Sequence, residues 1–374
     1  MSKKTLGVQS LLYEELLECD PDEYKRLLRV SSTQFFELLA RVQHRIVRQE
    51  TIMRPSVSAK TRLQITLRFL ATGETHYSLS RQFRVGHSTV NQLIEETCVA
   101  IYLELKDEFL KTPKTGGEWS ATMQDFKEKW QFPNCIGAID GKHVCIIKPK
   151  DSGSLYFNYK KTFSIVLFAL VDANYRFRYL DIGAPGSQGD GGIWQTTPLR
   201  KAIDEKNAGL PKTVKVASSP DLHMPPVIVG DDAFPLGENL MKPFGGDTLT
   251  PRQRIFNYRL SRARRVAENA FGILANRFRC FHTTIAATPR RARNYVAAAC
   301  VLHNFLATEL PPPAETPVEH QRAFFSVQPC RGRLRATACS LREDMCDFFT
   351  GSGAVPWQND MAYVNVSMHR ALSQ

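Results

Sequence analysis

The strongest constraint on the fold of this chain comes from three acidic residues and the segments that carry them. Asp140 lies inside the apolar, β-rich segment 135–147, and Asp231 ends a short apolar strand. Glu268 lies in an arginine-rich helical segment. Because an aspartate within an apolar strand is costly without a partner or a metal, the pattern predicts an α/β fold in which the three carboxylates converge. Carboxylate oxygens suit Mg²⁺ or Mn²⁺, and two such ions about 4 Å apart can hold both reacting oxygens of a phosphodiester.

The charge of the chain favours a polyanionic partner, nucleic acid first. The 374 residues carry a formal net charge of +12. A basic soluble enzyme without such a partner is the alternative. No apolar run is long enough to span a bilayer, and the N-terminus lacks the apolar stretch of a secretory signal. The nine cysteines are scattered and form no C-x-x-C pair, so we expect a reducing compartment rather than disulfides or a zinc site.

The N-terminal part of the chain is expected to be helical. Residues 1–54 form a first region, in which Asp20 and Pro21 start a helix. Residues 55–105 predict a helix-turn-helix unit, in which Gly86 supplies a positive φ and Ser88 caps the last helix. The first polar residues of that helix would meet base edges of DNA, with a plain helical bundle as the alternative. These residues are His87, Ser88, Asn91 and Gln92.

Residues 130–306 alternate strands and helices and form the third region. A hairpin is expected from strands 164–171 and 177–182, and a surface loop from the insert 212–226. A long basic helix or a helix pair is expected at 250–278, and an apolar helix at 294–306. Residues 307–374 begin as a proline-rich linker and continue as a tail that either docks on the core or stays loose.

This order of elements fits an α/β, ribonuclease-H-like catalytic core preceded by an all-α region. The first acid would lie in the middle of the central strand, the second at the end of a neighbouring strand, and the glutamate on a helix packed against the sheet. Asp231 is expected to be the ligand and Asp232 to cap the next turn, because a strand points adjacent residues to opposite faces. For Glu268, an ion pair with Arg264 or Arg265 is the alternative.

The chain resembles PIF/Harbinger-type transposases, or nucleases derived from them, over nearly its whole length. The two most specific motifs are residues 133–143 and 264–272. Further matching motifs are 67–73, 83–90, 159–165, 230–236 and 302–305. The resemblance implies a DDE triad of Asp140, Asp231 and Glu268, a divalent cation (Mg²⁺ or Mn²⁺) as cofactor, and Asp190 as a further metal-associated residue.

Basic residues around these acids are candidates for contact with the DNA backbone, because arginine grips phosphate oxygens in pairs. A solvated basic helix, or core packing of the neighbouring aromatic residues, is the alternative. The candidates are Lys160, Lys161, Arg262, Arg264 and Arg265.

These features predict a metal-dependent DNA endonuclease or transposase. The alternatives are a transposon-derived DNA-binding or adaptor protein without catalysis, and an RNA-directed nuclease on the same fold. The resemblance further implies a Myb/SANT-like DNA-binding partner protein and a location in the nucleus, with cytoplasm as a second site. A homo-oligomer is a further candidate assembly.

Overall fold

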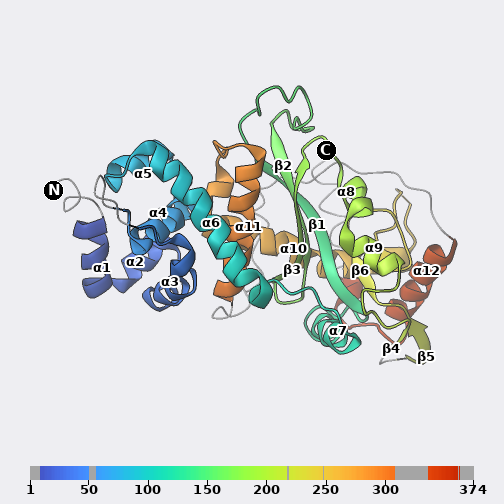
Figure 1. Cartoon of the computed structure of the whole chain (residues 1–374). Coiled ribbons are helices and arrows are strands. Elements are labelled where there is room, and N and C mark those ends of the chain that lie inside the picture. The colour runs from blue at the N-terminus through green and yellow to red at the C-terminus, as the bar shows by residue number, and fades with distance from the viewer. Residues whose placement is uncertain are drawn as a thin grey trace.

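The computed structural model describes residues 9–49, 56–216, 219–246, 248–307, 336–360 and 362. Figure 1 shows a group of helices on the N-terminal side and, next to it, a sheet with helices on both of its faces. The predicted proline-rich linker lies outside the described residues. No helix in the described parts combines the length and the apolar character that crossing a membrane requires.

In the described part of the chain, seven helical segments lie between residues 9 and 109. Asp20 caps the helix that begins with Pro21, as predicted: its side chain accepts a hydrogen bond from the Glu23 amide at 3.0 Å. Helix α4 ends at Gly73, whose φ of 72° provides the left-handed turn. The segments are η1 (Gln9–Tyr13), α1 (Glu14–Cys19), α2 (Pro21–Leu28), α3 (Ser32–Ile46), α4 (Ala59–Thr72), α5 (His76–Gln82) and α6 (His87–Phe109).

The turn before α6 differs in detail from the prediction. Arg84, with a φ of 52°, adopts the left-handed conformation that the sequence predicts for Gly86. Gly86 has a φ of −57° and is itself the N-cap of α6, so Ser88 lies inside the first helical turn and caps nothing. The helix also continues beyond residue 105, because its buried face packs against α4 and against the C-terminal helix α11 (Pro289–Leu306).

The central sheet has five strands in the order β3-β2-β1-β6-β7. Strands β1 (Cys135–Cys145), β2 (Ser164–Val171) and β3 (Phe177–Pro185) form antiparallel pairs. Strands β6 (Val227–Val229) and β7 (Leu240–Met241) continue the sheet in parallel with β1. The first three strands lie where the sequence predicts them. The chain is therefore a mixed α/β protein whose central strand carries Asp140.

Alternating residues of the strands build two cores, one on each face of the sheet. Leu167 and Ala169 pack toward α10 (Pro251–Arg277) and α11, while Val166 and Phe168 face the other side. That second side is covered by α7 (Gly116–Trp130), α8 (Asp190–Thr196) and α9 (Pro198–Asp204), as Figure 1 shows. Pro198 begins α9 and separates it from α8, because proline cannot continue a helix.

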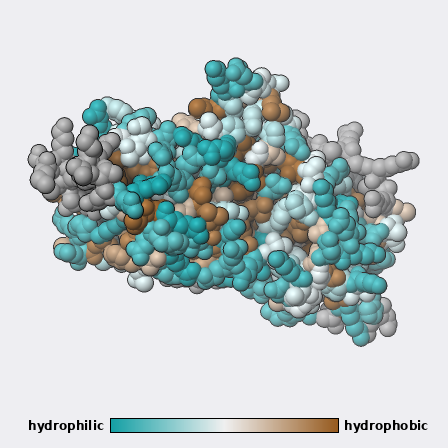
Figure 2. All heavy atoms as spheres, in the orientation of Figure 1, coloured by the Kyte–Doolittle hydropathy of each residue, from teal (hydrophilic) through white to brown (hydrophobic). Residues whose placement is uncertain are grey.

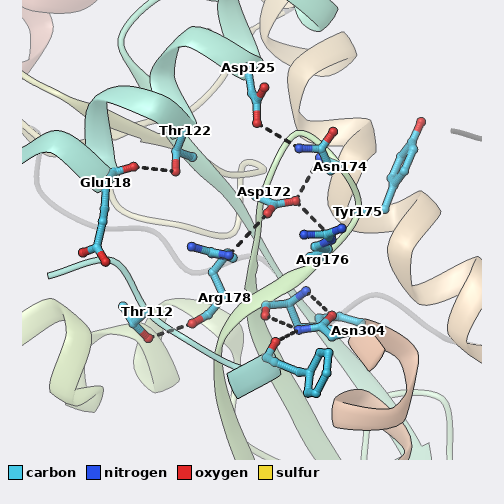
Figure 3. A network of polar contacts seen from close by, with 12 residues as sticks. Thr112, Glu118, Thr122, Asp125, Asp172, Asn174, Tyr175, Arg176, Arg178 and Asn304 are labelled. Atoms are coloured by element: carbon cyan, nitrogen blue, oxygen red, sulfur yellow. Dashed lines mark hydrogen bonds and ion pairs between the residues drawn. The ribbon is translucent and has the colours of Figure 1, made fainter. Parts of the chain in front are cut away.

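The turn of the β2–β3 hairpin is held by buried polar side chains, which Figure 3 shows from close by. Asp172 accepts hydrogen bonds from the backbone amides of Asn174 and Arg176 at 2.9 and 3.0 Å. On the adjoining strand, Asn304 of α11 bonds both backbone groups of Phe177 and the carbonyl of Phe109. Asn304 thus joins the sheet to the end of α6, which gives the motif at 302–305 a structural role.

Two segments, the insert at 212–226 and the C-terminal tail, contain regular secondary structure that the sequence does not predict. The insert expected to be a surface loop contains a small antiparallel hairpin, β4 (Val214–Val216) and β5 (Ser219–Met224). The described part of the tail contains α12 (Ala336–Thr350), which docks on α10, the first of the two expected arrangements. Figure 2 shows a mostly hydrophilic surface in this view, with hydrophobic atoms gathered near its middle.

Candidate active site

Asp140 lies in the middle of the central strand and is 2% exposed. Its Oδ1 accepts a hydrogen bond from the Gly141 amide at 2.9 Å. Its Oδ2 lies 2.9 Å from Nζ of Lys142, because residues two apart on a strand point to the same face. Burial acts against the charged ammonium, but the Asp140 carboxylate outweighs it and raises the pKa of Lys142. Sequence reasoning missed Lys142, although its spacing from Asp140 was a usable signal.

Asp190, the first residue of α8, is completely buried, and neither carboxylate oxygen has a side-chain hydrogen-bond partner among the described residues, although the Gly141 amide and the Lys142 charge both favour its ionised form. Burial and the charges of Asp140 and Asp231 raise the pKa of Asp190 well above its ordinary value. The carboxylate packs directly on Gly141: a Cβ at that position would lie 1.9 Å from Oδ1 of Asp190. Glycine therefore allows the two acidic segments to approach each other.

Asp231 follows β6 and turns back toward Asp140. Its Oδ1 accepts a hydrogen bond from the Ala233 amide at 2.9 Å. Asp231 therefore caps this turn, and the prediction that Asp232 does so is wrong. The exposed Asp232 forms an ion pair with Lys242 at 2.8 Å instead. Burial and the Asp140 charge raise the pKa of Asp231 to about 6.

Glu268 projects from α10, which packs against β1. It forms an ion pair with Arg264, one helical turn earlier, as the alternative interpretation of the sequence anticipated. Burial disfavours the charged guanidinium, but Glu268, Asp140 and Asp231 together raise the pKa of Arg264. Arg264 therefore faces the acids and is not free to bind distant phosphate.

The structure thus brings four acids and two cations into one electrostatically coupled cluster: Asp140, Asp190, Asp231 and Glu268 with Lys142 and Arg264. Within the described ranges, no three acidic, histidine or cysteine side chains are arranged closely enough to hold a metal ion. Lys142 and Arg264 supply positive charge among the acids. The four carboxylates nevertheless form a donor set made only of hard oxygens, which is the chemistry that Mg²⁺ and Mn²⁺ prefer.

His143 lies next to this cluster, on the face of β1 opposite to that of its neighbour Lys142. Its Nδ1 lies 2.8 Å from Oγ of Ser164, and its ring packs 5.9 Å from that of Tyr159. Burial, with the charges of Lys160 and Lys142, lowers the pKa of His143 to about 4. A neutral imidazole in this position can fix neighbouring side chains but carries no charge at neutral pH.

The loop between β1 and β2 protrudes next to the cluster and is the uppermost part of the molecule in Figure 1. Lys160 and Lys161 are exposed there. Tyr159 is 41% exposed and close enough to Lys142 and Asp190 for both charges to act on it. Polar and aromatic side chains thus adjoin the acids on an accessible loop.

The residues predicted to bind DNA from α6 have different surroundings. His87, Ser88 and Gln92 are exposed. Asn91 is half-buried, and its Oδ1 accepts a hydrogen bond from Arg291 at 2.7 Å. Three of the four side chains are therefore accessible from solvent, whereas Asn91 already has a partner on α11.

Most arginines of α10 make contacts within the chain, and these include the predicted phosphate-binding residues Arg262 and Arg264. Arg252 pairs with Glu343 and Asp347 of α12. Arg262 lies 4.4 Å from the ring of Trp357. Arg265, in contrast, is exposed. The sequence could not reveal these contacts, since the partners lie some 90 residues further along the chain.

Comparison with known proteins agrees with this geometry. Residues 139–304 match the family model described as DDE superfamily endonuclease. "Protein ALP1-like" of Arabidopsis thaliana is 27% identical over 298 residues, which cover 77% of this chain and 71% of that protein. "Putative nuclease HARBI1" of Homo sapiens is 23% identical over 286 residues, which cover 76% of this chain and 77% of that protein. No solved structure gives a significant match. Residues 139–304 therefore match a DDE superfamily endonuclease model, and the resemblance that the sequence motifs indicated is confirmed.

Proposed function

We propose that the chain is a divalent-metal-dependent DNA endonuclease or transposase with the triad Asp140, Asp231 and Glu268. Asp190 would be a fourth metal-binding residue. The observation that carries the proposal is the Asp190 carboxylate, which is completely buried close to Asp140 and has no side-chain hydrogen-bond partner among the described residues. A buried acid without a partner is costly, and a bound cation would remove that cost.

All four acids offer the oxygen ligands that Mg²⁺ and Mn²⁺ prefer, and a bound ion would have to draw them closer together than the described structure has them. Two such ions would activate the attacking oxygen and stabilise the leaving oxygen of a phosphodiester. Gly141 lets Asp190 approach Asp140, and the backbone at Ala233 fixes the orientation of Asp231. Arg264 holds the Glu268 side chain toward the other acids. These contacts position the carboxylates before substrate arrives.

The arrangement of the sheet supports a ribonuclease-H-like core. Asp140 lies in the middle of the central strand, and Asp231 follows the neighbouring parallel strand β6. Glu268 lies on a helix that packs against the same sheet. We propose the domain division given by the sequence: a helical region at 1–54, a helix-turn-helix unit at 55–105, the nuclease core at 130–306 and the tail at 307–374.

Contact with DNA is proposed for the accessible basic and polar residues only. They are His87, Ser88 and Gln92 on α6, Lys160 and Lys161 on the protruding loop, and Arg265 on α10. Phosphate contacts by the basic residues would hold the duplex without reading its sequence. A Myb/SANT-like partner protein, a homo-oligomer, and a location in the nucleus as well as the cytoplasm remain proposals from the resemblance.

Nicking of supercoiled plasmid by the full chain tests the function. The wild type is expected to nick with Mg²⁺ or Mn²⁺ and to stop in EDTA, whereas Asp140→Asn and Glu268→Gln are expected to lose nicking while remaining folded. Lys201→Gln, a change at an exposed position of α9, is the control and should retain full activity. Metal-independent nicking, or nicking by Asp140→Asn, would rule out the triad.

A DNA-binding adaptor without catalysis is the second candidate. The observation in its favour is the ion pair of Lys142 with Asp140 at 2.9 Å, which uses an oxygen that a metal would need. This function predicts that DNA binding persists in EDTA and in Asp140→Asn, with no nicking by the wild type under any condition.

Strand transfer, the second step of a transposase, has its own test. If strand transfer accompanies cleavage, a labelled 3′-hydroxyl end will become joined to target plasmid.

A further inference from the structure

A second charged site lies where the N-terminal helices meet the C-terminal ends of α10 and α11. A cavity of about 590 Å³ opens there between α2, α3, α10 and Leu306. Its charged lining consists of Lys25, Arg26, Arg29 and Arg277, opposed by one acid, Asp22. Arg26 forms an ion pair with Glu23 at 3.2 Å, so Lys25, Arg29 and Arg277 are the cations that leave the cavity positive. Cations and apolar ligands are therefore poor occupants, and an anion is favoured.

Two of these arginines, Arg29 and Arg277, are half-buried and have no ion-pair partner among the described residues. Nη1 of Arg277 and Nε of Arg29 are buried without a hydrogen bond, and neither side chain pairs with a carboxylate among the described residues. Arg62, by comparison, pairs with Glu96. Arg259 donates to the backbone carbonyls of Gln131 and Gly353. A charge that is partly removed from water without compensation is costly, and no carboxylate among the described residues pairs with Arg29 or Arg277.

The backbone fixes the positions of both side chains. Arg29 follows α2 and adopts a left-handed conformation with a φ of 62°, an uncommon conformation for a residue other than glycine. Arg277 is the last residue of α10. Burial lowers the pKa of Arg277 to about 10, and no carboxylate counteracts it. Burial, with the charges of Arg279 and Arg68, likewise lowers the pKa of Arg29.

We propose that this cavity binds a ligand bearing phosphate groups, through Arg29, Arg277, Lys25 and Arg26. Guanidinium groups bind phosphate oxygens in pairs, and several cations around one cavity match the multiple charges of a polyphosphate. The volume lies in the range of small-molecule sites and far exceeds the space that a single carboxylate requires. The phosphate groups belong either to a free polyphosphorylated compound or to a nucleic-acid backbone.

The proposed cavity is separate from the acid cluster. Glu268 and Arg277 are nine residues apart on α10, which places them on opposite sides of the helix and about 14 Å apart along its axis. Substitutions in the cavity therefore leave the acids in place. The inference does not depend on the proposed nuclease activity.

Calorimetric titration of the full chain with inorganic tripolyphosphate, in EDTA to exclude metal effects, tests the site. We expect one binding site in the wild type and an affinity weakened about tenfold or more in Arg277→Gln, because charge-assisted hydrogen bonds are lost. Lys25→Gln changes an exposed residue and should weaken binding even if Arg277→Gln does not fold. Lys201→Gln, equally exposed but on α9, is the matched control and should bind as the wild type does. No binding by the wild type, or equal affinities in all variants, would overturn the proposal.

Competition with labelled duplex DNA distinguishes the two sources of phosphate. If the backbone of DNA occupies the cavity, tripolyphosphate will lower the fluorescence anisotropy of bound duplex, and Arg277→Gln will weaken duplex binding. If the ligand is a free compound, tripolyphosphate will bind without displacing duplex. Both outcomes support a phosphate site. Asp140→Asn is expected to keep wild-type affinity for tripolyphosphate, so a failure of the nuclease proposal would be visible separately.

Discussion

The contact between Gly141 and Asp190 gives a sharp prediction for the substitution Gly141→Ala. The added Cβ would lie 1.9 Å from Oδ1 and 2.6 Å from Cγ of Asp190, so the carboxylate must move by about 1 Å or more to reach a tolerable separation. Asp190 is 0% exposed and cannot simply swing into solvent. Overpacking of this kind costs about 1–3 kcal/mol of unfolding free energy. A displacement of about 1 Å within an active site can lower the rate about 10²-fold.

Urea denaturation and plasmid nicking, measured on the same preparations, check both magnitudes. Gly272→Ala on α10 is the control, because a Cβ there meets nothing within 4 Å. It should keep full activity and gain about 1 kcal/mol from helix propensity. Gly141→Ala with unchanged stability would refute the close packing of Asp190 on the strand. Loss of stability with unchanged nicking would refute a role for Asp190 at the reacting centre.

Three further predictions concern buried polar groups. Lys142→Met removes the ammonium 2.9 Å from Asp140, so unfolding free energy without metal should fall by about 3–5 kcal/mol, and added Mg²⁺ should restore more stability than in the wild type. Equal urea midpoints for variant and wild type without metal would contradict it. Burial lowers the pKa of His303 to about 3. Since an unfolded histidine titrates near 6.5, the unfolded state binds more protons below that pH, and stability should fall by about 2 kcal/mol on going from neutral pH to about pH 5. His303→Gln should flatten this slope, and an unchanged slope would exclude His303 as its source. Asn304→Ala leaves the backbone groups of Phe177 without their partner and should cost about 2–4 kcal/mol in thermal or urea unfolding, whereas Asn276→Ala at an exposed position should cost almost nothing.

Local patterns in the sequence predicted much of the nuclease core. The apolar runs around Asp140 and before Asp231 mark buried strands, and Pro21, Gly73 and Thr250 mark helix ends because their local chemistry favours those positions. The pairing of strands 164–171 and 177–185 follows from the short turn between them. These features depend on neighbours in the sequence, which explains why they could be predicted.

Features that depend on distant contacts were not predictable in the same way. The arginines of α10 have a uniform appearance in the sequence, but α12 engages Arg252, and Trp357 covers Arg262. The left-handed residue of the turn before α6 is Arg84, although glycine has the higher preference. Asp190 was assigned only through the resemblance, because an acid at the start of a helix is common on protein surfaces and its burial beneath Gly141 arises from tertiary packing.

The charges of the cluster are not balanced, because four carboxyl groups face two cations. Lys142 pairs with Asp140 and Arg264 with Glu268, which leaves Asp190 and Asp231 without an ion pair. Burial first, and then the neighbouring acids, raise the pKa values of Asp190 and Asp231. Without added cations this excess of negative charge repels a phosphodiester. Binding of DNA at the acids should therefore require divalent cations, whereas binding at the exposed lysines of the protruding loop should not. Duplex affinity measured in EDTA should then depend on Lys160 and Lys161 and be insensitive to Asp231→Asn, and a large effect of Asp231→Asn in EDTA would contradict this reasoning.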